Sequence, residues 1–269
     1  MVICQSLWIG DKLSLMEYGC IKSFLKHGYE FHLYVYGEVE NIPEGVVIKD
    51  GNQILNKNDI FKEHGSILPF ADLFRFKMLY LCGGCWVDLD IICLKPFDEM
   101  LTKDILFSSE RTMKKGAYKS NNPTCPSINF MYSKKNKEII FEELYLMLLY
   151  KKGNMRNELE GMKVIKEFFK KKHPELKDNI LPPEHVNNMD WWHYQEFYLD
   201  KEFKMKYGVE PNLPITQGYM LHCWRNMFRR FKNRKGLYSQ LTFNKPVVGS
   251  LYDTHIEEYM EDYTFDYTY

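Results

Sequence analysis

Residues 70–98 read FADLFRFKMLYLCGGCWVDLDIICLKPFD, and the rest of the chain is organised around this stretch. It has the pattern of a helix, a Gly-Gly turn, a buried strand and, at the end of the strand, the carboxylates Asp88 and Asp90. Side chains alternate between the two faces of a strand, so residues two positions apart project to the same side. We therefore expect both carboxylates to face one pocket, with Leu89 facing the other way.

Two adjacent anionic groups repel each other, and a hard cation between them removes the repulsion. Carboxylate oxygens suit magnesium, manganese and calcium, and magnesium sites often combine one or two carboxylates with substrate phosphates. The bare Asp-x-Asp tripeptide also fits a solvated strand end. The apolar runs 85–87 and 91–94 on either side weaken that alternative, because burying an unpaired charge costs several kcal/mol. The stretch predicts a divalent-metal site that holds a phosphorylated ligand.

The same stretch matches a longer pattern, approximately S/A-D-x-x-R-x-x-x-L-x-x-x-G-G-x-Y/W-x-D-x-D. The matching positions are Ala71, Asp72, Arg75, Leu79, Gly83, Gly84, Trp86, Asp88 and Asp90. On these positions the chain resembles the Asp-x-Asp glycosyltransferases of the sugar-binding-region family (family 32), the related capsular polysaccharide synthesis proteins and, more distantly, the large clostridial glucosylating toxins. The resemblance implies an α/β GT-A fold, a nucleotide-sugar donor and a divalent cation, most often manganese, with magnesium as the alternative.

Strand and helix patterns alternate along the first part of the chain. The expected strands are 2–9, 31–36, 46–48, 104–109 and 127–133, and the expected helices are 14–27, 72–81, 137–151 and 161–172. This alternation predicts a Rossmann-like, mostly parallel central sheet flanked by helices. We expect a polar loop over the site at 111–126. The aromatic-rich segment 181–214 is expected to be irregular or a small subdomain, and either to form the acceptor side or to be a hydrophobic plug.

The length of 269 residues suits one GT-A catalytic domain spanning residues 1–269. Within it we expect a nucleotide-sugar-binding half up to about residue 135 and an acceptor-side half over about 136–251. The acidic, tyrosine-rich tail, residues 252–269, is expected to pack loosely or to be disordered.

Overall charge and apolar patterning exclude several classes of protein. The formal net charge is zero, which disfavours a nucleic-acid binder. No signal peptide and no run of about 18 apolar residues is visible, so we expect a cytoplasmic protein. The seven cysteines, an odd number without a secretory signal, are expected to be reduced thiols.

A basic segment runs from Arg225 to Lys235, with Phe228 and Phe231 between the charges. A solvated helix face is the ordinary interpretation of such a run. Diphosphate contact, or docking to an anionic lipid-linked acceptor or membrane surface, are the functional interpretations. The segment makes a peripheral membrane contact one of our expectations.

Three residues are candidates for binding the nucleotide. Trp8 follows the first strand, at the end where open α/β sheets bind ligands. A core tryptophan is the alternative, but the resemblance to the toxins implies that Trp8 stacks on the base. Asp72 and Arg75 share a helix face, where a surface ion pair would contribute at most about 1 kcal/mol. The resemblance implies instead that Asp72 faces the nucleoside and that Arg75 forks onto the donor sugar or diphosphate.

Two further candidates come from later in the chain. The resemblance places Asn129 near the donor sugar, although a hydrogen bond at a strand end would explain it equally. His222 and Trp224 share one face of a predicted strand. The resemblance implies that His222 completes the metal shell with Asp88 and Asp90 or contacts the diphosphate, whereas a lone histidine is otherwise more often structural. A neutral imidazole can bind manganese.

The resemblance also implies a chemical mechanism. Asp90 would bind the metal directly, and Asp88 would contact the ribose and reach the metal directly or through water. The enzyme, of hexosyltransferase type, would transfer a sugar to a glycan or glycolipid acceptor with retention of anomeric configuration.

Two alternative functions remain. One is another metal-dependent nucleotide- or phosphate-ligand enzyme, such as a nucleotidyltransferase, although residues 8–12 do not supply a phosphate loop. The other is a non-catalytic nucleotide-sugar-binding module.

Overall fold

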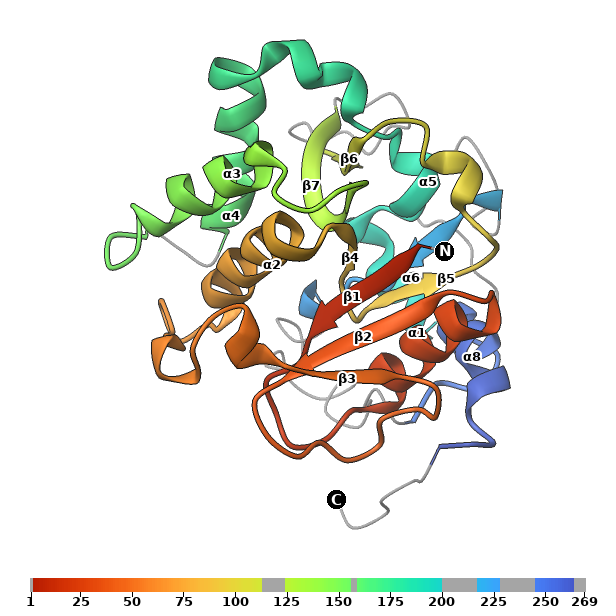
Figure 1. Ribbon diagram of the computed structural model, residues 1–269. Helices are drawn as coiled ribbons and strands as arrows, with labels where there is room; N and C mark the ends of the chain where they lie inside the picture. Colours follow the sequence, from red (N-terminus) through yellow and green to blue (C-terminus); the bar gives the residue numbers. More distant parts are fainter. Residues whose placement is uncertain (1, 113–123, 156–158, 200–216, 228–244, 264–269) are drawn as a thin grey trace.

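The computed structural model describes residues 2–112, 124–155, 159–199, 217–227 and 245–263, and a six-stranded sheet lies at its centre (Figure 1). Its strands, in the order in which they pair, are β3 (Val47–Asp50), β2 (Glu30–Val35), β1 (Ile3–Leu7), β4 (Gly84–Val87), β7 (Thr124–Ser133) and β6 (Ile105–Arg111). The pairs β3–β2, β2–β1 and β1–β4 are parallel, whereas β7 is antiparallel to both of its neighbours. The predicted mostly parallel sheet is confirmed.

Helices cover both faces of this sheet (Figure 1). They are α1 (Leu15–Lys26) on one face, and α2 (Leu68–Cys82), α3 (Ile139–Leu149) and α4 (Glu160–Glu167) on the other. The central strand β4 serves both layers, because Trp86 packs with the α2 side and its neighbours Cys85 and Val87 pack with the α1 side. The period of two along an apolar strand therefore builds both halves of the core.

Helix α1 begins and ends where its sequence predicts. The Ser14 backbone N–H donates to Glu17 Oε2 at 2.8 Å, which forms part of a capping box. Just after the helix, Gly28 has a φ of +83°, a left-handed conformation that favours glycine. The helix predicted over 14–27 is confirmed.

A two-stranded sheet links the middle of the chain to its C-terminal part. β5 (Ile91–Cys93) pairs antiparallel with β8 (Met220–His222), and Ile91 lies opposite His222. The other helices in the described part of the chain are α5 (Pro183–Val186), α6 (Tyr194–Leu199), α8 (Leu251–Ile256), a π-helical segment (Phe168–Lys172) and 3-10 helices at Gly51–Gln53, Lys57–Asp59, Asp98–Met100, Pro174–Asn179, Trp191–His193 and Glu257–Tyr259. The described part of 181–214 is thus built from short helices.

Arg111 was expected to open a polar loop, and that prediction is wrong. Strand β6 continues through Arg111, whose side chain is only 2 % exposed. Its guanidinium lies 3.1 Å from Asp190 Oδ1 and also pairs with Glu184. Two carboxylates compensate the buried charge, so the strand can bury an arginine at its end. Most of the predicted loop, residues 113–123, lies outside the described residues.

The acidic tail was expected to pack loosely, and that prediction is wrong as far as residue 263. Ile256, Tyr259 and Tyr263 are buried against α1 and its neighbours. The Tyr263 hydroxyl donates to the Leu13 carbonyl at 3.0 Å. Tyrosine supplies both apolar ring area and a polar group that finds a partner, so a tyrosine-rich tail can pack like core. Residues 264–269 lie outside the described range.

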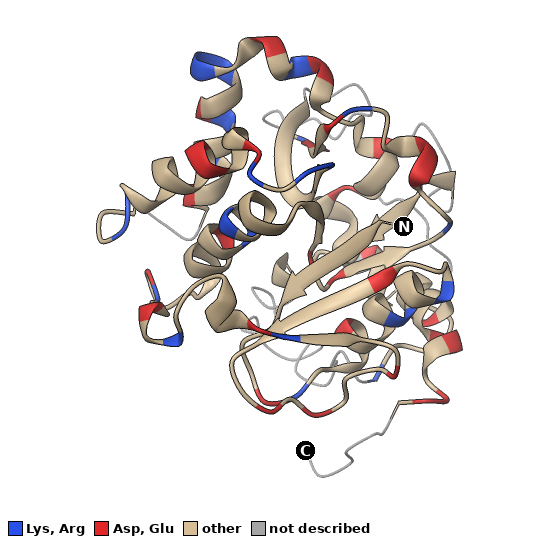
Figure 2. Cartoon of the chain, in the orientation of Figure 1, with Lys and Arg blue, Asp and Glu red and all other residues tan. Residues whose placement is uncertain are grey.

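Lys and Arg positions are interspersed with Asp and Glu positions in Figure 2. Among the described residues, none of the helices combines the length and the apolar character that crossing a bilayer requires.

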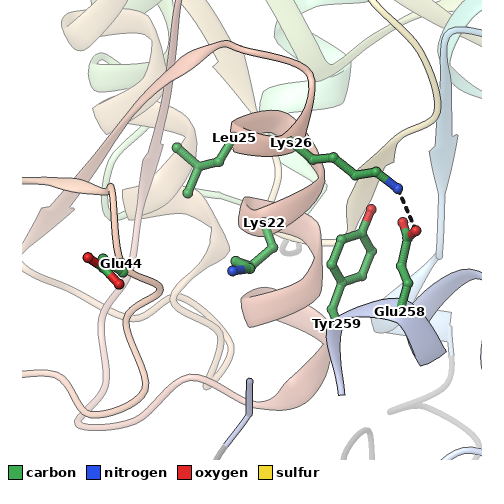
Figure 3. A pocket seen from close by; sticks show the side chains of 6 residues that line it. All are labelled: Lys22, Leu25, Lys26, Glu44, Glu258 and Tyr259. Atoms are coloured by element: carbon green, nitrogen blue, oxygen red, sulfur yellow. Dashed lines mark hydrogen bonds and ion pairs between the residues drawn. The ribbon is translucent and has the colours of Figure 1, made fainter. Parts of the chain in front are cut away.

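A surface pocket of about 390 Å³ lies beside α1 (Figure 3). It is lined by Lys22, Leu25, Lys26, Glu44, Glu258 and Tyr259, a set that includes none of the predicted site residues.

Candidate functional site

The predicted carboxylates follow β4 at its C-terminal end, next to the end of its parallel neighbour β1. The strand ends at Val87, and residues 88–90 turn into β5 instead of continuing the strand. The Ile91 N–H donates to the Asp88 carbonyl at 3.2 Å and closes this turn. Strand alternation therefore does not govern Asp88 and Asp90, and each carboxylate has its own partners.

Arg75 lies buried between Asp72 and Asp88. Its NH2 atom is 3.2 Å from Asp72 Oδ1, and its NH1 atom is 3.0 Å from Asp88 Oδ1. NH1 also donates to the Ile128 carbonyl at 2.8 Å, and the guanidinium lies 4.8 Å from the ring centroid of Trp86. The Trp86 indole N–H donates to Asp88 Oδ1 at 2.7 Å. The Asp72–Arg75 pair is thus a buried link to Asp88 and not a surface ion pair.

Burial shifts the pKa of both aspartates in this chain of contacts. It raises the pKa of Asp72 to about 7, although Arg75 and the Gly161 N–H act in the opposite direction. Burial also raises the pKa of Asp88, and Arg75 again opposes the shift. Arg75 faces both carboxylates but offsets only part of the effect of burial, so both pKa values stay above the ordinary value.

Asp90 faces His222 across the β5–β8 pair. His222 Nε2 lies 3.3 Å from Asp90 Oδ2, and the Arg225 backbone N–H donates to the same oxygen at 2.9 Å. Burial by itself would raise the pKa of Asp90, but His222 and Arg225 outweigh it and lower the pKa. Burial lowers the pKa of His222, but Asp90, together with Asp88 and Glu110, outweighs burial, so the pKa is raised. Both shifts have the same cause, the attraction between the carboxylate and the protonated form of the imidazole.

A buried polar network lies behind His222. Asn187 Oδ1 is 3.0 Å from His222 Nδ1 and accepts from Asn129 Nδ2 at 2.7 Å. Asn129 Oδ1 accepts from the Ser108 hydroxyl at 2.5 Å. Asn187 Nδ2 donates to the Ser109 carbonyl at 2.8 Å. The side chain of Asn129 therefore takes part in supporting His222.

Asn187 was not among the residues that the sequence identified. It belongs to the segment 181–214, whose composition indicated only irregular structure. A backbone bridge between Asn187 and Leu221 brings it to β8. A single asparagine with no local motif carries no signal of this contact. Trp224, in contrast, was expected beside His222, and their ring centroids are 4.0 Å apart.

Trp8 lies beyond the C-terminal end of β1, beside Arg225. The guanidinium of Arg225 is 5.4 Å from the Trp8 ring centroid, and its Nε lies 2.9 Å from Glu17 Oε1. The Trp8 indole N–H is buried and has no acceptor among the described residues. A Cβ added at Gly10 would lie 3.0 Å from this nitrogen, so glycine keeps the space beside the indole open.

The predicted site residues thus fall into three connected groups. Asp72, Arg75 and Asp88 form the first group, and Asp90, His222 and Asn129 form the second. In the third, Trp8 lies beside Arg225, whose backbone N–H bonds Asp90 of the second group. Of the predicted basic segment, only residues 225–227 belong to the part of the chain that the structure describes, and Arg225 there faces Glu17.

The described residues contain no group of three or more His, Cys, Asp or Glu side chains arranged to hold a metal ion. Asp90 and His222 do present a carboxylate oxygen and an imidazole nitrogen 3.3 Å apart, whereas Asp88 Oδ1 faces Arg75 and Trp86. Magnesium-type sites commonly take one or two carboxylates and complete their shell with substrate phosphates. This donor set fits a cation that binds together with a phosphorylated ligand, not a closed cage of protein ligands.

A family model described as capsular polysaccharide synthesis protein matches residues 19–221. Among solved structures, the chain is similar to the apo WbbM bifunctional glycosyltransferase (12% identity, 97% of this chain, 50% of that chain, TM-score 0.51). It is also similar to the galactosyltransferase LgtC in complex with donor and acceptor sugar analogues (10%, 99%, 98%, TM-score 0.49) and to the PaToxG glycosyltransferase (15%, 65%, 71%, TM-score 0.47). No curated protein matches the sequence.

The fold is the part of the prediction that these findings establish. The chain has a mixed α/β architecture with a mostly parallel six-stranded sheet flanked by helices, as in GT-A glycosyltransferases. It spans half of the WbbM chain. At identities this low the likeness concerns the fold, and function depends on the side chains at the site.

Proposed function

Because this chain belongs to the capsular polysaccharide synthesis protein family, we propose that it is a glycosyltransferase that moves a sugar from a nucleotide-sugar to a hydroxyl group of a glycan or glycolipid acceptor. One observation supports the proposal most directly: Asp90 faces His222 at 3.3 Å at the C-terminal edge of the central sheet, with Asp88 two residues away. Open α/β sheets bind their ligands at this edge, and phosphorylated ligands commonly bring a divalent cation.

We assign Asp90 and His222 as the protein ligands of that cation, manganese by the family resemblance or magnesium. A divalent cation bound there would neutralise the negative charge that develops on the departing nucleoside diphosphate. Asp88 would contact the ribose and reach the cation directly or through water. Arg75 holds Asp88 through its guanidinium and, by the resemblance, would also approach the diphosphate or the sugar.

The nucleoside would lie between Trp8 and Asp72. The Trp8 indole, whose N–H has no acceptor among the described residues, can stack on the base and donate to a ligand atom. Asp72 is buried and holds Arg75, so its part is to position the arginine as well as to face the nucleoside. Asn129 would act at the donor sugar and through its bond to the network behind His222.

Transfer with retention of anomeric configuration, as in the resembling families, is part of the proposal. So is the division into a nucleotide-sugar-binding half up to about residue 135 and an acceptor-side half over about 136–251. All six strands of the main sheet fall in the first half. The departing phosphate can take the proton of the acceptor hydroxyl, so the proposal assigns no separate general base.

A thermal-shift panel tests the proposal. It compares UDP-, GDP- and TDP-sugars, with and without Mn²⁺, on the wild type, on Asp90→Ala and on Asp104→Ala, an exposed aspartate that serves as the control. Ligand at 100 times its dissociation constant adds about 2.7 kcal/mol to the free energy of unfolding. We expect a Mn²⁺-dependent shift with one nucleotide class, lost only in Asp90→Ala. A folded wild type that no nucleotide-sugar stabilises would contradict the proposal and favour another phosphate-ligand enzyme.

A further inference from the structure

Asn187 is a fully enclosed side chain that the proposed chemistry does not use. It is 1 % exposed, and its amide lies between the end of β6 and the imidazole of His222. A buried amide must satisfy both its donor and its acceptor atoms, because an unpaired group would cost free energy. Its two ends therefore report which groups around it donate and which accept.

The orientation of this amide follows from its partners. A backbone carbonyl can only accept, so the group 2.8 Å from the Ser109 carbonyl is the Asn187 NH₂. Oδ1 then points to His222 Nδ1 at 3.0 Å and to Asn129 Nδ2 at 2.7 Å. Asn129 is itself oriented by the Ser108 hydroxyl, which donates to its Oδ1 at 2.5 Å. Asn129 Nδ2 also lies 2.9 Å from His222 Nδ1, although it is closer to Asn187 Oδ1, at 2.7 Å. A hydrogen on Nδ1 pairs this nitrogen with Asn187 Oδ1, which can only accept, whereas a bare Nδ1 would pair it with Asn129.

We infer that Asn187 is a positioning residue that fixes the tautomer and the ring orientation of His222. With its hydrogen held on Nδ1, the imidazole directs Nε2 toward Asp90, as a donor to the carboxylate or, without that proton, as a lone pair for a cation. Hydrogen-bond acceptors behind ligating histidines commonly have this role, and their loss costs 10- to 100-fold in metal affinity. The inference rests on the proposed function, because it concerns the same cation.

Two variants of Asn187 separate the acceptor role from a purely structural one. Asn187→Asp keeps an acceptor oxygen toward His222 but loses the NH₂ group that bonds Ser109. Asn187→Leu loses both. Asn179→Leu is the matched control, since Asn179 also donates to a β6 carbonyl, that of Ile105 at 2.8 Å, at the far end of the strand. The measurement is the dissociation constant of Mn²⁺, followed by the electron paramagnetic resonance signal of free Mn²⁺ in the presence of saturating UDP, or of the diphosphate of whichever nucleotide class stabilises the wild type.

We expect Asn187→Leu to bind Mn²⁺ about 10- to 100-fold more weakly than the wild type, and Asn187→Asp and Asn179→Leu to stay within about threefold. Equal losses in Asn187→Asp and Asn187→Leu would overturn the inference in favour of a structural role through Ser109. Unchanged affinity in Asn187→Leu would overturn it as well. A wild type that binds no Mn²⁺ with any of these diphosphates would instead overturn the proposed function, and the inference with it.

A measurement on the unmodified protein covers the case in which Asn187→Leu does not fold. Long-range ¹H–¹⁵N correlation spectra of the histidine side chains, recorded with the same diphosphate and diamagnetic Zn²⁺ in place of Mn²⁺, report which ring nitrogen of His222 carries the hydrogen. The spectrum of a His222→Gln variant identifies the signals. We expect a hydrogen on Nδ1 and none on Nε2. A bare Nδ1 would overturn the inference.

Discussion

At the scale of single residues, the site is built from side chains that hold one another. Asp72 holds Arg75, and Arg75 holds Asp88, over ion-pair distances of 3.2 and 3.0 Å. Each of the three would be costly to bury alone, because a buried charge without a partner loses its hydration. A change that moves Asp72 should therefore be felt at Asp88, even though the two carboxylates do not touch.

Gly161→Ala tests this chain of contacts. In a helix, Gly→Ala ordinarily stabilises by about 1 kcal/mol, but a Cβ at Gly161 would lie 2.1 Å from Asp72 Oδ2. We expect a loss of about 1–3 kcal/mol in the free energy of unfolding, as for other overpacked sites, together with weaker binding of the nucleotide-sugar. Urea unfolding and thermal shift measure the two effects. Gly37→Ala is the control, because no atom lies within 4 Å of its Cβ position. Unchanged stability and binding in Gly161→Ala would show that Asp72 moves without disturbing Arg75.

At the scale of elements, one buried arginine ties strand β6 to α5 and to the segment that follows α5. Arg111 pairs with Glu184 and Asp190, and the neighbouring Asn187 bonds the Ser109 carbonyl. The segment that carries Asn187 is thereby anchored at several points along the end of β6. The position of the network behind His222 depends on this anchoring.

The pH dependence of stability should reveal the buried Asp190. Burial raises its pKa to about 6, despite Arg111, whereas an unfolded aspartate has a pKa of about 3.9. Between these values the folded state binds more protons, so the contribution of Asp190 to stability is largest below about pH 4 and is lost as the pH rises through about 6. We expect the unfolding free energy of the wild type, relative to Asp190→Asn, to fall by about 2–3 kcal/mol from pH 4 to pH 7. A difference in urea-unfolding free energies that stays constant with pH would contradict this.

At the scale of the whole molecule, the C-terminal segment is part of the core that supports α1. The Tyr18 and Tyr263 rings meet edge to face at 5.2 Å, and the Ile256 side chain packs so closely on Gly19 that a Cβ there would lie 2.3 Å from it. Helix α1 carries Glu17, whose carboxylate meets Arg225 beside Trp8. The segment beyond residue 250 therefore stabilises the layer on which the nucleotide end of the site rests.

Ile256→Ala measures this contribution. Ile256 is fully buried, so its truncation should cost about 2–5 kcal/mol, as in an ordinary core. Val248→Ala is the control, because Val248 is 76 % exposed and should change the free energy of unfolding by no more than about 0.5 kcal/mol. Thermal or urea unfolding gives both values. Equal, small effects would mean that the segment packs loosely, as its composition first indicated.

The sequence by itself determined the class of fold and the position of the acidic pair. Apolar residues recur with a period of two in its strands and of 3.6 in its helices, and a Gly-Gly turn separates one helix from one strand. Each of these patterns involves residues close together in the sequence, so it predicts local structure without knowledge of the path of the chain. Helix α1, strand β4 and the carboxylates after it are of this kind. The longer pattern in residues 70–98 also indicated Asp72 and Arg75, through the resemblance to glycosyltransferase families and not through their spacing, which fits a surface ion pair equally.

Only the tertiary structure decided how these residues are used. Asp90 meets the Arg225 N–H from 135 positions away, and His222 meets Asn187 from 35 positions away. No periodic pattern encodes such pairs, because they depend on where β5–β8 pairing and the short helices bring the chain. The same holds for Arg111 and for the tyrosine-rich tail. Their charged and polar composition indicates exposure, but partners elsewhere in the chain compensate the cost of burying them.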